Sequence, residues 1–169
     1  MQMRAKSRLA AGLLVAAALG LSGCGFTPLY AQSGVASNLA AVDVVAPEGR
    51  AGFLLREHLD DALGKNRSLA PAYRMKLNVS ETRFPRGVRI DNVATRYEYV
   101  LVTDYTLTSL PSGAVAKRGQ VRVELTYDSA DQPYSAISAQ QDAQDRAASE
   151  AARRIQLEVA AWLAAGAKS

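Results

Sequence analysis

The sequence is poor in the residues that metal centres and catalytic sites use. Its 169 residues contain one cysteine and one histidine. A single cysteine cannot form an internal disulfide bond. His58 has no second histidine or cysteine to complete a metal site and no serine motif for which it would act as a base. We therefore expect a protein that is not an enzyme and holds no metal or cofactor, with His58 at the surface or boundary of a helix.

The sequence also lacks a strong charge of one sign over most of its length. The formal net charge is +4, and three basic residues, Arg4, Lys6 and Arg8, lie within the first eight positions. The remaining 17 basic residues stand against 16 acidic ones, a net charge of +1. Domains that bind nucleic acid usually carry a clear positive excess on one face. We therefore expect no nucleic-acid partner.

Long apolar runs are scarce, and the one that stands out covers the thirteen residues from Leu9 to Leu21. It is too short to cross a bilayer as a permanent helix, and it follows a basic segment, as the apolar region of a secretory signal does. A buried core helix or a poor membrane anchor is the alternative, but the basic flank and the turn residues that follow favour export. Residues 1–23 are therefore interpreted as a signal peptide.

The apolar run ends in Leu21-Ser22-Gly23-Cys24, which resembles the lipobox of bacterial lipoproteins. The resemblance implies cleavage after Gly23, a diacylglyceryl thioether on Cys24 and a third acyl chain on the new amino terminus. Each buried methylene stabilises membrane binding by about 0.8 kcal/mol, so several chains anchor firmly where one would not. Gly25 stands where aspartate would favour inner-membrane retention, which favours the outer membrane. Residues 24–38, rich in small and turn-forming residues, are interpreted as the acylated terminus and a tether.

Residues 39–166 show alternating strand and helix patterns. Strand patterns cover 39–46, 73–80, 96–110 and 120–127, and helical patterns cover 49–65 and the stretch from a capping box at Ser138 and Gln141 to Gly166. The order is β-α-β-β-β-α, in which the first crossover makes strands one and two parallel. We predict an α+β fold, a two-layer sandwich with two helices on one face of a four-stranded mixed sheet.

The first candidate binding feature is a basic segment, Arg83-Phe84-Pro85-Arg86-Gly87-Val88-Arg89, predicted to be a loop between the second and third strands. Three guanidinium groups around a Pro/Gly turn suit phosphate or carboxylate groups, because each can make two parallel hydrogen bonds. The alternative is a soluble loop with ordinary surface charge. We treat Arg83, Arg86 and Arg89 as a hypothetical site for an anionic ligand.

The second candidate feature is the third predicted strand, which has apolar or aromatic side chains on both faces. Tyr97, Tyr99 and Tyr105 lie on one side, and Val100 and Val102 lie on the other. A strand with helices on one side only is usually polar on its free side. Either the strand is covered on both faces, or one face docks a partner through its tyrosines, which bury much area at a low entropy cost. The sequence leaves both readings open.

The segment Gly23-Cys24-Gly25-Phe26-Thr27-Pro28-Leu29-Tyr30 resembles the opening of the LptE family of lipopolysaccharide-assembly lipoproteins. The strand and helix order and the stretch 133–143 are also similar to that family. The resemblance implies a lipid-anchored protein on the periplasmic side of the outer membrane. It also implies a role as plug and support of an LptD-like β-barrel that delivers lipopolysaccharide to the outer leaflet. Lipopolysaccharide contact through the arginine segment is a separate hypothesis, based on the residues alone.

Two other classes share a lipoprotein signal and an α/β body. One is an auxiliary lipoprotein of an inner-membrane lipid or ABC transport system, and the other is a periplasmic structural lipoprotein without lipid cargo. Fractionation distinguishes the first from an outer-membrane protein, and co-purification with a barrel distinguishes all three.

Overall fold

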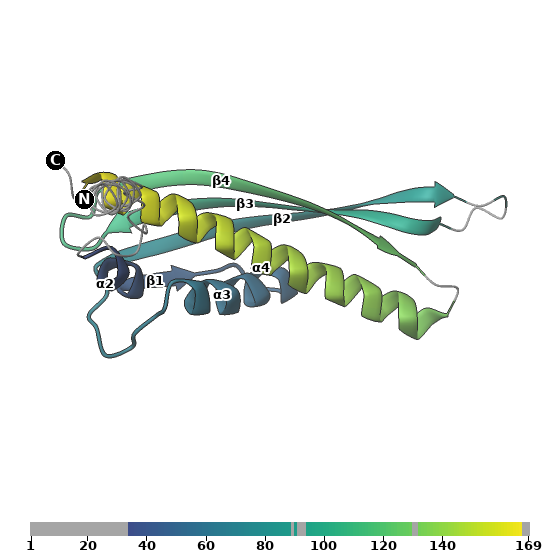
Figure 1. The fold of residues 1–169 in the computed structure, drawn as a ribbon, viewed down its shortest axis with the longest axis horizontal. Coiled ribbons are helices and arrows are strands. Elements are labelled where there is room, and N and C mark those ends of the chain that lie inside the picture. Colours follow the sequence, from purple (N-terminus) through teal and green to yellow (C-terminus); the bar gives the residue numbers. More distant parts are fainter. Residues whose placement is uncertain (1–33, 89, 91–93, 130–131, 167–169) are drawn as a thin grey trace, which may run out of the picture.

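The computed structural model describes residues 34–88, 90, 94–129 and 132–166. The predicted signal peptide, Cys24 and Arg89 lie outside these residues. The described chain forms four strands and three helices (Figure 1). In chain order these are α2 (Val35–Ala40), β1 (Val42–Val45), α3 (Arg50–Ala62), β2 (Tyr73–Val88), β3 (Ala94–Ser109), β4 (Val115–Asp128) and α4 (Pro133–Gly166).

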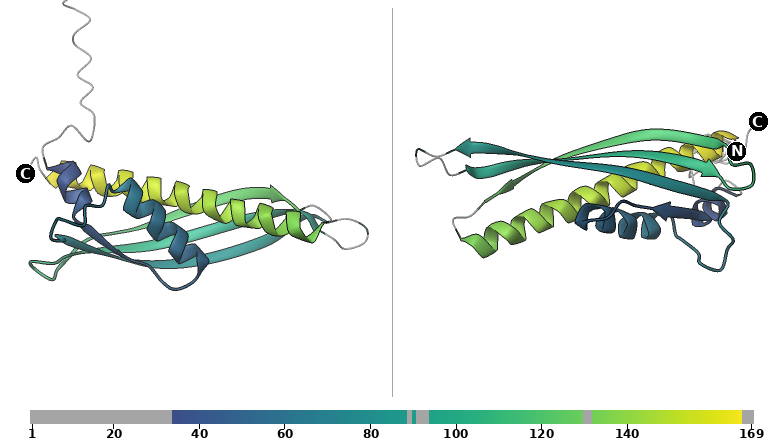
Figure 2. Two further views of the ribbon diagram at one scale, coloured as in Figure 1. Left: turned by 90° about the horizontal axis from the view of Figure 1, so that it is seen from below. Right: turned by 180° about the vertical axis from the view of Figure 1, so that it is seen from behind.

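The strands form one mixed sheet in the order β1-β2-β3-β4. β1 pairs with β2 in parallel, from Val42 opposite Tyr73 to Val45 opposite Lys76. The other two pairings are antiparallel. Figure 2 shows the helices on one side of this sheet and the other side uncovered. The predicted α+β sandwich with a four-stranded mixed sheet is confirmed, and α2 adds a third helix to its helical layer.

The core lies between the helices and the odd-numbered side chains of the three long strands. Successive strand residues point to opposite faces, so apolar residues at every second position line one side. Among the largest side chains in this core are Leu55, Leu59, Met75, Leu101, Leu107, Ile155 and Val159, all with 0% of their surface exposed.

The folded body begins earlier than the sequence predicted, because residues assigned to the tether form α2. Val35 and Leu39 are one helical turn apart, so both point the same way. They are 1% and 2% exposed and pack into the core. The predicted boundary at residue 39 is therefore wrong, since two apolar residues at helical spacing suffice to attach this segment to the core.

The predicted loop around the arginines is also wrong. Arg83 and Arg86 lie within β2, which is paired with β3 as far as Val88. Proline is tolerated in an edge strand, and β2 is an edge strand at Pro85 because β1 ends at Val45. Pro85 thus does not end β2, and its usual meaning as a turn signal misled the prediction.

The last helix begins five residues before the predicted capping box, at Pro133. Proline is favourable at the first helical position, where its missing N–H costs nothing. The hydroxyl of Ser135 donates to the carbonyl oxygen of Gln132 at 2.8 Å. With 34 residues, α4 is about 50 Å long and runs along most of the molecule (Figure 1).

α4 and the three long strands extend well beyond α2, α3 and β1, so the molecule has two halves that differ in composition. We call α2, α3, β1, residues 148–166 of α4 and the sheet beneath them the basal half. The distal half comprises residues 80–88 of β2, 94–102 of β3, 122–128 of β4 and 133–147 of α4.

Candidate functional site

The tyrosines proposed as a partner interface point toward the helices. Tyr99 is 3% exposed and Tyr105 is 1% exposed, and both belong to the core. The Tyr99 hydroxyl donates to Glu81 at 2.6 Å, and the Tyr105 hydroxyl donates to Glu158 at 2.5 Å. Burial and the neighbouring carboxylate raise the pKa of each hydroxyl. The interface hypothesis is therefore wrong for Tyr99 and Tyr105, and the core-packing alternative holds.

Tyr97 is partly buried and takes part in a cluster between the sheet and α4 in the distal half. Its ring stacks on Tyr127 with the centroids 5.6 Å apart. The Arg83 guanidinium lies over the Tyr97 ring, 4.9 Å from its centroid, and donates to Gln140 of α4. Below it, Glu81 accepts a second hydrogen bond, from Gln144 of α4, at 2.9 Å. Polar groups therefore connect the early part of α4 to the sheet.

Arg86 lies on the opposite face of β2, because residues three apart in a strand point to opposite sides. Its Nε and Nη2 both donate to one oxygen of Glu98, at 2.9 and 2.6 Å. Arg83 and Arg86 thus do not converge on one point, and each already has a partner in the chain. A single anion site formed by both is not present, and only Arg89, outside the described residues, is left unplaced.

The uncovered face of the sheet is the largest functional candidate that the sequence analysis missed. Ion pairs cross it from strand to strand or run along a strand: Arg74–Asp43 at 3.3 Å, Arg86–Glu98 at 2.6 Å, Arg96–Asp128 at 2.8 Å and Arg122–Glu124 at 2.6 Å. Exposed pairs of this kind each contribute about 0–1 kcal/mol to stability. Their main effect is to give this face a polar surface with nearly balanced charge.

Val100 lies in the middle of this charged face and is only 2% exposed. Its neighbours across the strands are Thr82 and Glu124. Val100 is thus shielded by its neighbours on β2 and β4, whereas Val102 on the same side of β3 is partly buried. The signal that would have revealed this face is the charge at alternating positions, as in Arg96 and Glu98 or Arg122 and Glu124.

The described residues contain no cluster of three or more histidine, cysteine or acidic side chains that would hold a metal ion. His58 lies on α3 and bonds to Asp145 of α4 at 2.9 Å, with 28% of its side chain exposed. Its predicted place at the boundary of a helix is confirmed. Within residues 34–166, leaving out the gaps, no helix is long and apolar enough to cross a membrane.

Comparison with known proteins connects this architecture to a family. The family model of LptE, described as lipopolysaccharide-assembly, matches residues 38–158. The crystal structure of a chain from Caulobacter crescentus, described as a lipoprotein, is 54% identical over 79% of this chain and 98% of that chain, with a TM-score of 0.70. No match was found among curated proteins.

More distant structures share the fold. Rare lipoprotein B from Shewanella oneidensis is 14% identical over 76% of this chain and 97% of that chain, with a TM-score of 0.52. Lipoprotein B from Nitrosomonas europaea is 15% identical over 75% of this chain and 86% of that chain, with a TM-score of 0.56. The family match and the Caulobacter structure together show that this chain belongs to the LptE family of lipopolysaccharide-assembly lipoproteins.

Proposed function

We propose that the protein is held in the outer membrane by acyl chains on Cys24 and acts as the plug and support of an LptD-like β-barrel. In this role it helps the barrel place lipopolysaccharide in the outer leaflet. The observation that carries the proposal is the uncovered sheet face with its ion pairs. The interiors of large outer-membrane barrels are polar, and a body inside one needs a polar surface on the side that has no helices.

The outer side of α4 supports the same role, because it is polar as well. Asp142 pairs with Arg146, and Glu150 pairs with Arg153 and Arg154, at 2.7–2.8 Å. Charges of both signs therefore lie on the uncovered sheet face and on the outer side of α4. A plug of this kind contacts a polar lumen without leaving unpaired buried charge, which would be costly.

The anchor is tested by mass spectrometry of the native protein. We expect an amino terminus at Cys24 that carries acyl chains, and a Cys24→Ser variant that leaves the membrane fraction. An unmodified thiol or an uncut amino terminus would refute the proposed anchor.

The barrel partnership is tested by fractionation and co-purification from the organism's envelope. We expect the protein in the outer-membrane fraction, together with a barrel protein in a stable complex. Recovery from the inner membrane with an ABC transporter would instead support the alternative of an auxiliary transport lipoprotein.

We further propose that Arg83, Arg86 and Arg89 contact phosphate groups of lipopolysaccharide, each on its own. Arg83 and Arg86 are exposed despite their partners in the chain. Changing all three to glutamate should weaken binding of purified lipopolysaccharide several-fold at low salt, where screening is weakest. A control variant has the same change of net charge at three other exposed arginines, Arg56, Arg67 and Arg118. Equal affinity of the two variants would refute this contact.

A further inference from the structure

The edge of β2 loses its neighbour part of the way along the strand. β1 pairs with β2 only from Tyr73 to Lys76, whereas β2 continues to Val88. Figure 1 shows β2 and β3 running far beyond the end of β1. From Leu77 onward, the backbone groups of β2 on this side have no strand beside them among the described residues. Such a row of N–H and C=O groups is a template for another strand.

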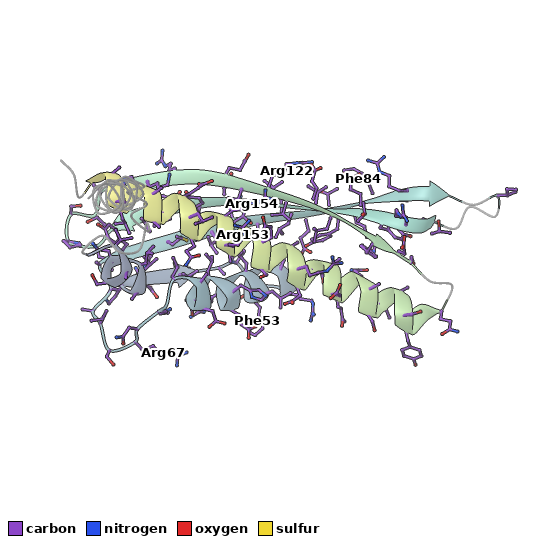
Figure 3. The ribbon with its side chains drawn as sticks, viewed as in Figure 1. Phe53, Arg67, Phe84, Arg122, Arg153 and Arg154 are labelled. Atoms are coloured by element: carbon purple, nitrogen blue, oxygen red, sulfur yellow. The ribbon has the colours of Figure 1, made fainter. Side chains whose placement is uncertain are left out.

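The other edge of the sheet, formed by β4, has different surroundings. β4 forms that edge, and α4 packs against it. The Arg154 side chain reaches over from α4, and its Nη1 donates to the backbone carbonyl of Arg122 at 3.0 Å. Figure 3 shows Arg122 and Arg154 in this region. An edge carbonyl of β4 is thus already bonded, while no described side chain bonds the backbone of residues 77–84 of β2.

The free edge of β2 is bounded by a hollow at one end and by Pro85 and Gly87 at the other. At the β1 end lies a hollow of about 420 Å³ with apolar and polar lining, formed by Val45, Ala46, Pro47, Lys76, Leu77 and Asn78. At the other end, Pro85 has no N–H to offer, and Gly87 has a left-handed backbone with φ of 59°. The usable edge therefore runs from Leu77 to Phe84, slightly longer than an average strand.

We propose that this edge binds one extended strand of the partner polypeptide, which continues the sheet where β1 stops. Backbone hydrogen bonds to residues 77–84 would supply the affinity, as in other cases of strand addition. An apolar side chain of the incoming strand fills the hollow beside Pro47. Lys76 has no ion-pair partner among the described residues, so an acidic residue at the start of the strand complements it.

The inference rests on the proposed function, because it takes the barrel protein as the donor of the strand. Its test is hydrogen exchange of the full acylated protein, alone and in its complex with the barrel. We expect slower exchange in the complex for every second backbone amide of residues 77–84, since the amides that point away from β3 gain hydrogen bonds while the others already bond to β3. Amides of residues 118–126 in β4 are the internal reference and should change less.

A pair of matched variants gives a second readout. Val45 borders the hollow and is 42% exposed, and Val115 lies at the start of β4 and is 48% exposed. Both valines tolerate a polar substitution because neither is in the core. Val45→Arg blocks the hollow and should reduce the barrel recovered with the protein several-fold, whereas Val115→Arg should not.

The outcomes separate the two proposals. A complex that forms without slower exchange in residues 77–84, or that responds equally to both variants, overturns the strand addition and leaves the plug role intact. Failure to recover any barrel overturns both. Slower exchange that requires only a second copy of this chain, with a dimer in sedimentation, assigns the edge to self-association and also overturns the inference.

Discussion

The basal and distal halves are held together by different forces, although one helix and three strands run through both. In the basal half, large apolar side chains such as Leu59 of α3 and Ile155 and Val159 of α4 are fully buried. In the distal half, α4 contributes only small side chains such as Ala143 and Ala147 to the core, opposite buried sheet residues such as Leu101, and polar bonds add to this contact.

This difference implies unequal local stability. Burial of a large aliphatic side chain contributes about 1.5–3 kcal/mol, while an ordinary hydrogen bond contributes about 0.5–1.5 kcal/mol net. Segments with fewer buried apolar contacts open more readily than the core. We therefore expect the distal half to open locally while the basal half stays folded, which leaves residues 80–84 of the free β2 edge on the more adaptable part of the sheet.

The largest effect should follow from removing a basal core side chain. Leu59→Ala leaves a cavity at a residue with no exposed surface, and such changes cost about 2–5 kcal/mol. Leu125→Ala makes the same change at a partly buried distal position and should cost less than half as much. Urea unfolding of the two variants measures the difference. Equal costs would show that the halves do not differ in packing.

A second prediction for the basal half concerns the close packing of Gly119 against the Tyr105 ring. A Cβ added at Gly119 would lie 2.5 Å from both Cε1 and Cζ of the Tyr105 ring. Gly119→Ala should therefore destabilise the protein by about 1–3 kcal/mol through overpacking. The double variant with Tyr105→Leu should cost less than the sum of the two single changes, because it removes the clash. An additive result in thermal unfolding would contradict this close contact.

The polar connection of the distal half is tested at Glu81. Glu81→Ala leaves the buried Tyr99 hydroxyl and the Gln144 amide without their acceptor, at a cost of about 1–2 kcal/mol. Hydrogen exchange should become faster in residues 133–147 of α4 and change little in residues 148–166. Glu124→Ala, which removes an exposed pair with Arg122, is the control and should leave both segments unchanged. Uniformly faster exchange along α4 would mean that the halves open together.

The smallest effect is expected at Glu150, which lies on α4 near the junction of the halves. Hydrogen bonds from Arg153 and then Arg154 lower the pKa of this carboxyl from 4.5 to about 2. Because the folded pKa is depressed, the stabilisation is present above pH 4.5 and is lost as the pH falls toward 2. Solvent screening keeps it below about 1 kcal/mol. Glu150→Gln should thus be slightly less stable at pH 7, and the difference from the parent protein should shrink below pH 4.5; a constant difference would contradict the assignment.

Periodicity predicted most of the sheet because burial on one side imposes it directly. The alternation through Met75, Leu77, Val121 and Val123 agrees with the observed helix-facing side of β2 and β4. The larger residues in the later part of α4 also pack as the sequence suggests. Errors arose where local signals conflict with tertiary context, as at Pro85 in β2 and at Val35 and Leu39 in α2.

The candidate site was harder to predict than the fold. Arg83 and Arg86 are three residues apart and point to opposite faces of β2. The register of β2 against β3 decides which partner each of them meets. β2 and β3 form a long hairpin. The loop predicted from the sequence, at residues 83–89, lies several residues too early, because β2 continues to Val88. Once the register is known, Arg86 meets Glu98 on one face, and Arg83 meets Tyr97 and Gln140 on the other.

The sequence by itself determined the class of fold, the helix-facing side of the strands and the resemblance to a lipoprotein family. Each of these follows from local spacing or from a contiguous motif. Only the tertiary structure decided that Tyr99 and Tyr105 are core residues, that ion pairs cross the free face and that the edge of β2 lies open beyond the end of β1. These features depend on strand register and on the unequal lengths of β1 and β2, which bring together residues far apart in the chain.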